Sequence, residues 1–381
     1  MRIAFLTELF PYYQNKKLIC PAGGEARYYF LAKNLSKNYE IEILTTKPNR
    51  NYPSFEKING IKINRLSLRR NPGIDSLIFA LKALKYLKNN EFDLIDANQF
   101  LPHLVNYFSK NKAKKVNTIH DIYLAYDKFR GINFWIKNNG LIGLGGWFIE
   151  NLELFFDRYI EKIVVVSEWT KQKALKFGIP KEKIVLVSNG IDFEKINSIQ
   201  SFKQRDKIIC IGRFIKYKNQ LHAVKAFNEI LKSNENLTLN FVYSGSIGNY
   251  ETILKNEVKK LNLEKKVFFH KAISEEQKFK LLKESLLMLF PSICEGQGIA
   301  ILEALACGTP VVAYNLPAYK GMIENAKNGF IVEKNNILAL VEASKKVLEN
   351  QKRFSINAKA KAKEFDWKKI TKLYEKKIIN N

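Results

Sequence analysis

The chain has 381 residues and a mass of 44.1 kDa. Single hydrophobic cores rarely grow beyond ~250–300 residues, so this length predicts two domains. Hydrophobic residues make up 46% of the sequence, charged residues make up 26%, and the mean hydropathy is −0.22, which excludes a disordered chain.

The net charge of +26 is the one unusual bulk property. Residues 1–196 carry 31 basic and 19 acidic side chains, a net +12, and the remainder carries 32 and 18, a net +14. Such an even excess favours anionic partners, whether nucleic acid, acidic lipid or phosphorylated substrates. Nucleic-acid-binding proteins gather their basic residues in one patch, and here the charge is diffuse, so we expect no nucleic-acid partner.

No segment has the composition of a membrane span, because no uncharged run reaches ~18 apolar residues. The N-terminus has one basic residue, and Thr7 and Glu8 break its apolar run, so it is a poor signal peptide and a good first strand. We therefore expect a cytoplasmic protein. The cysteines form no C-x-x-C pair, which predicts reduced thiols rather than a zinc cluster or a disulfide framework; they are Cys20, Cys210, Cys294 and Cys307.

In the first half of the chain, short apolar runs rich in β-branched residues alternate with amphipathic segments. Residues 26–37 and 76–88 place apolar side chains three and four positions apart, which is typical of helices. The alternation predicts a parallel sheet covered on both faces, with ligands at the carboxyl ends of its strands. The expected strands are residues 3–7, 41–45, 61–66, 94–97, 116–119, 163–166 and 184–187.

A second series of the same kind follows a polar stretch at residues 197–206. We therefore predict an α/β protein with one Rossmann-like domain over residues 1–196 and another over residues 204–362. A cleft between such domains is where a substrate is expected. The last segment, residues 363–381, reads as a basic helix that packs back on the first domain. The second set of expected strands is residues 207–211, 239–243, 267–269, 286–290, 310–313 and 330–332.

The most informative segment begins at Glu295, directly after one of these strands. It reads as a glycine-containing loop, a helix that starts near Gly298, and a Gly-Thr-Pro stop before the next strand. The free N–H groups and the positive dipole end of such a helix suit a phosphate. Glu295 and Glu303 bracket the helix start, where carboxylates can accept hydrogen bonds from sugar hydroxyls. An exposed loop charge and a solvated helix position explain the two glutamates equally well.

Three other sites carry notable residues at the ends of expected strands. Arg213 can bind phosphate oxygens bidentately, and Lys218 supplies a mobile point charge beside it. His120 ends another strand, although a single histidine is more often a structural hydrogen bonder than a ligand contact. Gly23 and Gly24 open the helix after the first strand, where glycine lets the backbone approach a ligand closely.

Together these segments resemble glycosyltransferase family 4, nucleotide-sugar enzymes of the GT-B fold. The resemblance rests on the E-x7-E motif of Glu295 and Glu303 with the A-C-G-T-P-V-V-A run that follows it. The G-R-x4-K spacing of Arg213 and Lys218 and the T-x-H-D context of His120 extend it, and V-V-S-E-W-T and V-S-N-G-I-D carry it over nearly the whole chain. It implies two Rossmann-like domains facing a central cleft.

The resemblance also implies roles for individual residues. Glu295 would contact the donor sugar, Glu303 the ribose, and His120 the sugar near the reacting carbon. Arg213 and Lys218 would form the pyrophosphate clamp, so the catalytic candidates are His120, Arg213, Lys218 and Glu295. The other implied donor contacts are Gly23, Gly24, Ile273, Gly296, Gln297, Gly298 and Ile299.

Two departures limit what the resemblance implies about the donor. The family usually has an aromatic residue where this chain has Gln297, and commonly a glycine where it has Lys271. The resemblance therefore specifies neither the sugar nor whether the donor is linked to UDP or to GDP.

The implied reaction is a retaining transfer, with the donor bound mainly to the second domain and the acceptor to the first. No residue is an obvious in-line nucleophile, so we expect front-face attack in which the leaving diphosphate takes the acceptor proton. We expect no metal and no cofactor beyond the nucleoside diphosphate sugar, and the chain has no D-x-D triplet. A nucleotide-sugar epimerase and a non-catalytic nucleotide-sugar-binding protein of the same fold are the alternatives.

The acceptor depends on residues 129–160, where Trp135, Trp147 and several phenylalanines lie among glycines and basic residues. Such a segment suits a membrane interface and a polyprenyl-lipid or other lipid acceptor. A helix and loop that bury these aromatic side chains explain it equally well. With the charge of +26, we favour an enzyme that contacts the inner face of an anionic membrane peripherally and builds a lipid-linked or cell-surface glycan precursor.

Overall fold

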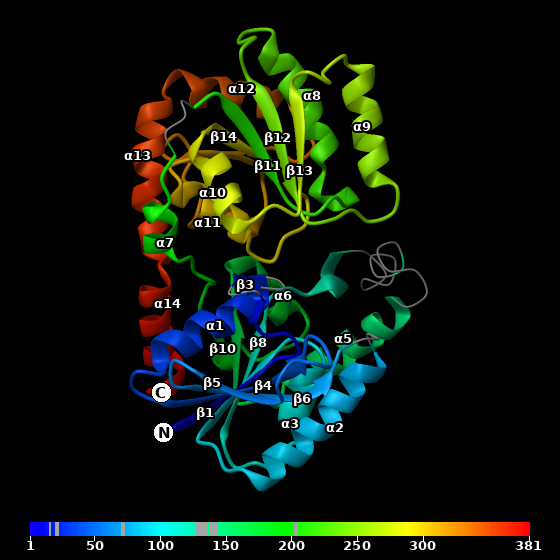
Figure 1. Cartoon of the computed structure of the whole chain (residues 1–381), viewed down its shortest axis with the longest axis vertical. Coiled ribbons are helices and arrows are strands. Elements are labelled where there is room, and N and C mark those ends of the chain that lie inside the picture. The colour runs from blue at the N-terminus through cyan, green and yellow to red at the C-terminus, as the bar shows by residue number, and fades with distance from the viewer. Residues whose placement is uncertain (15–16, 20–22, 70–72, 127–135, 137–142, 202–204) are drawn as a thin grey trace. The chain divides into compact units, whose positions relative to one another are not determined.

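The computed structural model describes residues 1–14, 17–19, 23–69, 73–126, 136, 143–201 and 205–381 (Figure 1). The chain divides into two compact units, Met1–Asn189 with Trp367–Asn381, and Gly190–Asp366. The sequence suggested a boundary at residue 196 instead. The difference arises because helix α7 (Phe193–Ser198) packs against helix α11 (Ile299–Ala306) of the second unit.

An eight-stranded sheet forms the centre of the first unit, with the strand order β10-β9-β8-β7-β1-β4-β6-β5. Every strand that the sequence predicted for this half is present, and neighbouring strands run parallel. The antiparallel edge strand β5 and a separate hairpin of β2 and β3 were not predicted. The strands are β1 (Arg2–Leu6), β2 (Tyr12–Gln14), β3 (Lys17–Ile19), β4 (Glu40–Lys47), β5 (Phe55–Ile58), β6 (Ile61–Leu68), β7 (Leu94–Asn98), β8 (Lys114–Ile119), β9 (Lys162–Val165) and β10 (Ile184–Leu186).

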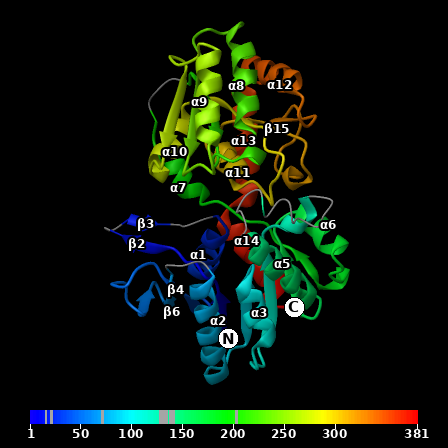
Figure 2. The ribbon, with the colours of Figure 1, turned by 90° about the vertical axis from the view of Figure 1, so that its right-hand side faces the viewer.

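Alternate side chains of the strands enter two cores on opposite faces of this sheet. In β1, Ile3 and Phe5 pack with α1 and α14, whereas Ala4 and Leu6 pack with α2 and α3. Helix α3 contacts both α2 and α5, and the three helices lie next to one another in Figure 2. The helices are α1 (Gly23–Leu35), α2 (Ile74–Asn89), α3 (Leu101–Phe108), α5 (Gly143–Asp157), α6 (Glu168–Lys176) and α14 (Trp367–Tyr374), with a π-helical turn at Glu375–Ile379.

The second unit has a six-stranded, fully parallel sheet in the order β13-β12-β11-β14-β15-β16. Both units therefore contain the Rossmann-type order, which reverses beside β1 and beside β11. The strands are β11 (Lys207–Ile211), β12 (Thr238–Tyr243), β13 (Val267–Lys271), β14 (Ser285–Phe290), β15 (Val311–Tyr314) and β16 (Gly329–Val332). The remaining helices are α8 (Gln220–Leu231), α9 (Tyr250–Lys260), α10 (Glu275–Lys283), α12 (Ile337–Glu349) and α13 (Gln351–Ala362), with 3-10 turns η1 (Tyr123–Tyr126), η3 (Lys181–Lys183), η4 (Lys216–Lys218), η5 (Pro317–Tyr319) and η6 (Lys363–Phe365).

These sheets confirm the prediction of an α/β protein built on two Rossmann-like parallel sheets. In the described part of the chain, no helix is both long enough and apolar enough to span a bilayer. Cys210 and Cys307 are buried, and burial raises the pKa of each thiol to about 12, so both stay protonated and unreactive. Cys20 lies outside the described residues.

Asp96 of β7 joins the C-terminal helix to the first unit. Its carboxyl group is fully buried, and Tyr374 of α14 donates a hydrogen bond to its Oδ2 at 2.7 Å. Tyr28 of α1 and Thr118 of β8 donate to its Oδ1 at 2.9 and 2.8 Å. Burial raises the pKa of Asp96, and these hydroxyl groups act in the opposite direction by stabilising the charged form.

We expect Tyr374→Phe to lower the free energy of unfolding by about 1–3 kcal/mol, because it removes one hydrogen bond from a buried carboxylate. Tyr39→Phe is the matched control, since Tyr39 donates to Glu375 Oε1 at 2.7 Å in the same terminal segment but in a partly exposed place. That change should cost less than about 1 kcal/mol. Urea unfolding followed by circular dichroism measures both, and equal losses would contradict the role given to Asp96.

Candidate functional site

A cavity of about 210 Å³ lies at the carboxyl ends of β11, β12 and β13 in the second unit. The strand order reverses beside β11, and ligands of α/β sheets bind at such a point. Two of the predicted donor-binding residues, Arg213 and Ile273, line this cavity. Tyr243, Ser274 and Lys278 also line it, and none of these three was predicted from the sequence.

The turn after β11 brings two cationic side chains to this edge of the sheet. Gly212 has a φ of 147°, a conformation that favours glycine, and the chain turns there so that Arg213 is exposed at the cavity. Gln220 holds the turn by donating to the backbone carbonyl of Arg213 at 3.1 Å. Lys218 follows at the end of η4, and a Cβ placed on Gly212 would lie 3.6 Å from its Cδ. Lys218 thus lies close to the turn that carries Arg213.

Lys218 forms an ion pair with Glu295, which lies in the loop after β14. The Glu295 side chain is only 10% exposed, so its interpretation as an exposed loop charge is wrong. Burial lowers the pKa of Lys218, but the charge and hydrogen bond of Glu295 outweigh it, and the net pKa is raised. The ammonium group is therefore permanently charged at this point.

Glu303 of α11 forms a second pair of the same kind. Lys278 of α10 donates to Glu303 Oε1 at 2.7 Å, and the Glu303 side chain is 17% exposed, so it is not a solvated helix position. Burial lowers the pKa of Lys278, and Glu303 again outweighs it to give a net increase. Because Lys278 also lines the cavity, this pair lies at the cavity wall.

The N-terminus of α11 depends on the predicted Gly298. This residue has a φ of 88°, and a Cβ there would lie 3.2 Å from Ile301 Cδ1 and from Tyr319 Cε1. Gly298 is the N-cap and supplies no side-chain acceptor, and its carbonyl accepts from the N–H of Ile301 at 2.9 Å, so no side chain of the cap covers the N–H groups before Ile301. Gln297 before it is buried, and Ile299 is the first helical residue.

The first unit presents polar groups at the carboxyl ends of β7 and β8. Gln99 Oε1 accepts hydrogen bonds from the backbone N–H groups of His120 and Asp121 at 3.0 and 3.2 Å. Asp121 is buried and forms an ion pair with Lys173 of α6 at 2.6 Å. The backbone at His120 is therefore held by Gln99, and the next residue, Asp121, is held by Lys173.

His120 has the properties of a ligand contact rather than of a satisfied structural histidine. Its Nε2 atom is buried and has no hydrogen-bond partner among the described residues. Burial lowers its pKa to about 3, and the positive charges of Arg27 and His103 act in the same direction. The imidazole is thus neutral at physiological pH, and Nε2 can exchange a hydrogen bond with a bound molecule.

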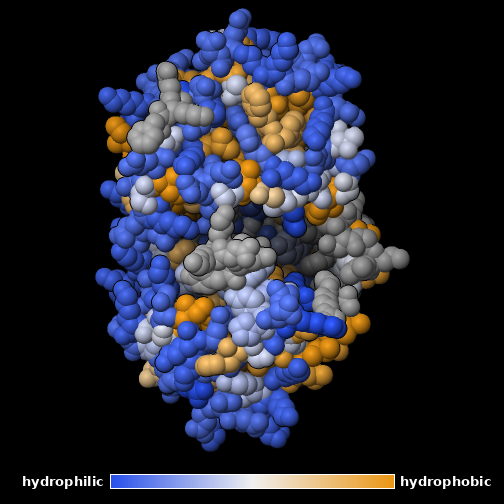
Figure 3. All heavy atoms as spheres, in the orientation of Figure 1, coloured by the Kyte–Doolittle hydropathy of each residue, from blue (hydrophilic) through white to orange (hydrophobic). Residues whose placement is uncertain are grey.

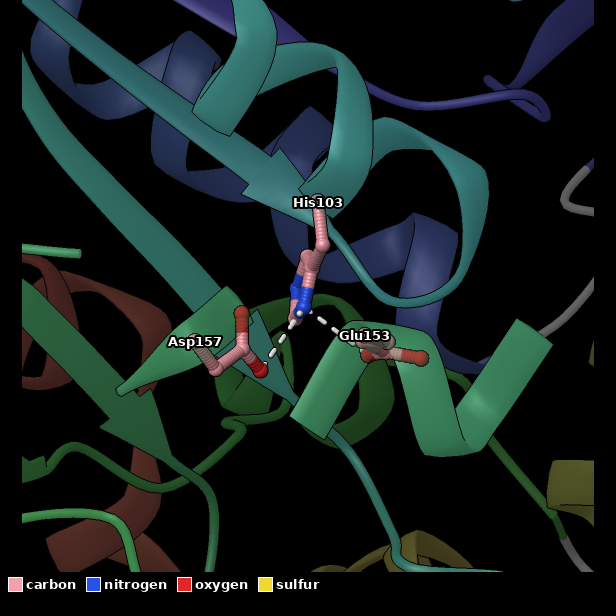
Figure 4. Close-up of side chains that lie close together, drawn as sticks. All are labelled: His103, Glu153 and Asp157. Carbon is pink, nitrogen blue, oxygen red and sulfur yellow. Dashed lines mark hydrogen bonds and ion pairs between the residues drawn. The ribbon is translucent and has the colours of Figure 1, made fainter. Parts of the chain in front are cut away.

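His103, behind His120 in the same unit, is in the opposite state (Figure 4). Its Nδ1 lies 2.8 Å from Glu153 Oε1 and 3.1 Å from Asp157 Oδ2, and its Nε2 lies 3.1 Å from the carbonyl of Thr118. Burial lowers the pKa of His103, but the two carboxylates outweigh it and raise the pKa to about 10. Although the three side chains are close enough to hold a metal ion, an imidazolium that donates from Nδ1 to Asp157 and from Nε2 to the carbonyl of Thr118, with its charge beside Glu153, accounts for the contacts of His103.

Gly23 and Gly24 are the first residues of α1, as predicted. Arg27 in the same helix is fully buried and was not predicted as a site residue. Its Nη1 donates to the carbonyls of Val187 and Ser188 at 3.1 and 3.0 Å, which ties α1 to the loop after β10. Its Nε and Nη2 are buried and lack a partner within the described ranges.

Besides Tyr243 and Ser274, the residues that were not predicted from the sequence are Gln99, Lys278 and Arg27. Gln99 follows a predicted strand directly, so its position beside His120 could have been found from the parallel sheet. Lys278 lies one turn after the Ser274 capping box of α10, a recognisable helix start. The burial of Arg27 leaves no signal in one sequence.

We predict opposite protonation states for His103 and His120. In histidine-labelled protein, NMR should show that His103 keeps its proton up to about pH 10 and that His120 stays neutral down to about pH 3. His222 and His270 provide internal references, because burial lowers the pKa of each and neither lies beside the carboxylates that surround His103. Titration of His120 near pH 6.5 would contradict its buried, neutral state.

Comparison with known proteins agrees with this arrangement. Residues 21–195 match the family model described as Glycosyltransferase Family 4, and residues 192–364 match the one described as Glycosyl transferases group 1. The sucrose-phosphate synthase of Thermosynechococcus elongatus has a similar structure, with a TM-score of 0.78 and 18% identity over 100% of both chains.

The names of two relatives specify acceptors linked to diphospho-undecaprenol. The N-acetylgalactosamine-N,N'-diacetylbacillosaminyl-diphospho-undecaprenol 4-alpha-N-acetylgalactosaminyltransferase of Campylobacter jejuni is 28% identical over 92% of this chain and 94% of its own length. The UDP-Gal:alpha-D-GlcNAc-diphosphoundecaprenol alpha-1,3-galactosyltransferase of Escherichia coli is 23% identical over 72% of each chain. With both family models matched and both Rossmann-type sheets in place, the chain belongs to the family 4 glycosyltransferases of the GT-B fold.

Proposed function

We propose that the chain is a retaining hexosyltransferase that moves a sugar from a UDP- or GDP-sugar to a lipid-linked glycan precursor. The observation that carries this proposal is the cavity beyond β11, with Arg213 and Lys278 in its wall and the Lys218–Glu295 pair beside it. A cavity with both cationic and carboxylate groups suits a ligand with a diphosphate at one point and hydroxyl groups at another.

The diphosphate would be held by Arg213, Lys218 and the N–H groups at the start of α11. These groups are positioned before the donor arrives, so they can stabilise the charge that develops on the leaving group without reorganisation. Lys218 would then be shared between Glu295 and the diphosphate. Glu295 would also accept a hydrogen bond from the donor sugar, and Glu303 one from the ribose.

The transfer would proceed on one face of the sugar. The bond between the anomeric carbon and the diphosphate oxygen breaks, the acceptor oxygen bonds to the same carbon, and the acceptor proton moves to the departing diphosphate oxygen. His120, as a neutral imidazole, would bind a hydroxyl of the donor sugar through Nε2. We expect this chemistry to need no divalent metal, because fixed cationic and N–H groups neutralise the leaving group.

The acceptor class rests on the two relatives whose names specify diphospho-undecaprenol acceptors. A polyprenyl-linked acceptor is presented at a membrane surface, and the charge of +26 favours an anionic one. We therefore place the enzyme at the cytoplasmic face of a membrane, in peripheral contact with it.

The test is release of nucleoside diphosphate from a panel of UDP-, GDP- and ADP-sugars in EDTA, with and without a crude lipid extract. We expect release from a UDP- or GDP-sugar only when the extract is present, with the sugar recovered in the lipid fraction. Conversion of the donor without any acceptor would favour an epimerase. An unchanged donor in every reaction, despite measurable nucleotide binding, would favour a non-catalytic binding protein.

We predict that Lys218→Met lowers kcat/KM for the donor by about 10²–10³, because it removes a preorganised cation at the leaving group. Lys216→Met is the matched control, since Lys216 is an exposed lysine of the same η4 turn, and it should change kcat/KM by less than about twofold. Lys218→Arg keeps the charge beside Glu295 and should retain more activity than Lys218→Met. Similar effects of Lys218→Met and Lys216→Met would contradict the role of Lys218.

A further inference from the structure

Helix α2 carries an apolar stripe on its outer surface. Ile74, Leu77, Ile78 and Leu81 follow the spacing of one helix face and are exposed, with 68% of Ile74 and 61% of Leu81 accessible to solvent. The opposite face of α2 is buried against the sheet. The helix therefore has two apolar faces. One is buried against the sheet in the folded chain, and the other remains exposed.

Helix α5 buries its charged residues and exposes two of its phenylalanines. Its acidic residues, Glu150, Glu153 and Asp157, are all buried, and Glu153 and Asp157 contact His103 (Figure 4). Phe148 and Phe155 are exposed instead, with 58% of Phe148 accessible. The outer surface of α5 thus carries no charged residue, the reverse of an ordinary surface helix.

Helix α5 shows whether part of the aromatic segment predicted to be either exposed or buried is exposed. Within residues 129–160, Phe148 and Phe155 are exposed, Trp147 is partly buried, and Trp135 lies outside the described residues. The alternative in which the segment buries its aromatic side chains therefore does not hold for Phe148 and Phe155 of α5.

The two apolar surfaces belong to one face of the first unit. Helix α3 contacts both α2 and α5, and its last residue, Phe108, is exposed and lies 5.0 Å from the ring of Phe156. The ring of Phe155 lies 5.9 Å from that of Tyr159, which is also exposed. Figure 3 shows hydrophobic side chains gathered at the lower right, over the region that α2 and α5 occupy in Figure 1. We call this surface the α2–α5 face; it consists of Ile74, Leu77, Ile78, Leu81, Phe108, Leu144, Phe148, Phe155 and Tyr159.

Exposed lysines accompany the α2–α5 face. Lys82, Lys85 and Lys88 continue along α2 from the apolar stripe, and Lys110 and Lys112 follow α3. Because the acidic residues of α5 are buried, they do not offset these charges at the surface. Projecting aromatic and aliphatic side chains with lysines beside them match the boundary between acyl chains and anionic headgroups.

We propose that the α2–α5 face docks on the surface of an anionic membrane. The role of this docking in the reaction rests on the proposed function, because docking would hold the first unit at the surface where a lipid-linked acceptor is presented. The apolar side chains enter the headgroup and acyl boundary, and the lysines bind the lipid phosphates. The docking is peripheral and adds no membrane-spanning segment.

Sedimentation of the full chain with vesicles tests the docking without any sugar donor. Vesicles of phosphatidylcholine mixed with phosphatidylglycerol should bind the chain, and Leu81→Glu/Phe148→Glu should weaken binding by at least about tenfold, since two apolar contacts are replaced by repelled charges. Leu338→Glu/Ile356→Glu is the matched control, because both residues are equally exposed but lie in the second unit. It should bind like the unaltered chain. Raised salt and pure phosphatidylcholine should each weaken binding.

Each contrary result overturns the proposal. Mixed vesicles that fail to bind the chain, or equal losses in the two double variants, would remove the α2–α5 face as the docking surface. A chain that is dimeric by light scattering, and monomeric only as Leu81→Glu/Phe148→Glu, would make this face a subunit interface. Docking and transfer fail separately: vesicle binding without nucleotide release would leave docking intact and contradict the proposed reaction.

Discussion

The carboxyl group of Asp96 is fully buried, and burial of a carboxylate has to be compensated there and at several strand ends of this chain. A carboxylate taken out of water costs several kcal/mol unless hydrogen bonds or a cation compensate it. Three hydroxyl groups meet this requirement at Asp96. Lysines meet it in the pairs Lys173–Asp121, Lys218–Glu295 and Lys278–Glu303. Each pair joins a helix or turn to a different segment, so the loops beyond the strands are held by charge pairing.

This pairing makes the candidate site rigid before any ligand is present. Lys218 and Lys278 are each paired with a glutamate in the absence of a ligand, so in the proposed function a bound diphosphate would not have to order them first. The pairs also keep the lysines charged, because Glu295 and Glu303 raise the pKa values that burial alone would lower. In the proposed function, the phosphate and hydroxyl groups of the donor would therefore join pairs that already exist.

Much of this arrangement could be predicted from the sequence, and the limits have physical causes. Continuous apolar runs and glycine-bounded helix starts predicted both sheets, because local spacing determines them. Arg213, Lys218 and Glu295 follow the neighbouring parallel strands β11 and β14, so the parallel sheet brings the segments that carry them to one edge. The partners of Glu295 and Glu303 could not be predicted, since the helix that supplies Lys278 could have turned either face to the sheet. The edge strand β5 was missed because its residues alternate weakly between exposed and partly buried positions.

Two histidines of the first unit show why the protonation state of a side chain could not be predicted from the sequence alone. His103 and His120 differ in their immediate neighbours: two carboxylates surround His103, whereas His120 has only positive charges near it. The first is therefore charged and the second neutral, although His103 is buried and His120 is half-buried in the same unit. By taking up Glu153 and Asp157, the charged His103 also allows α5 to turn its acidic residues inward and its phenylalanines outward. The two buried ion pairs of His103 thus connect the electrostatics next to His120 with the apolar character of the surface of the same unit.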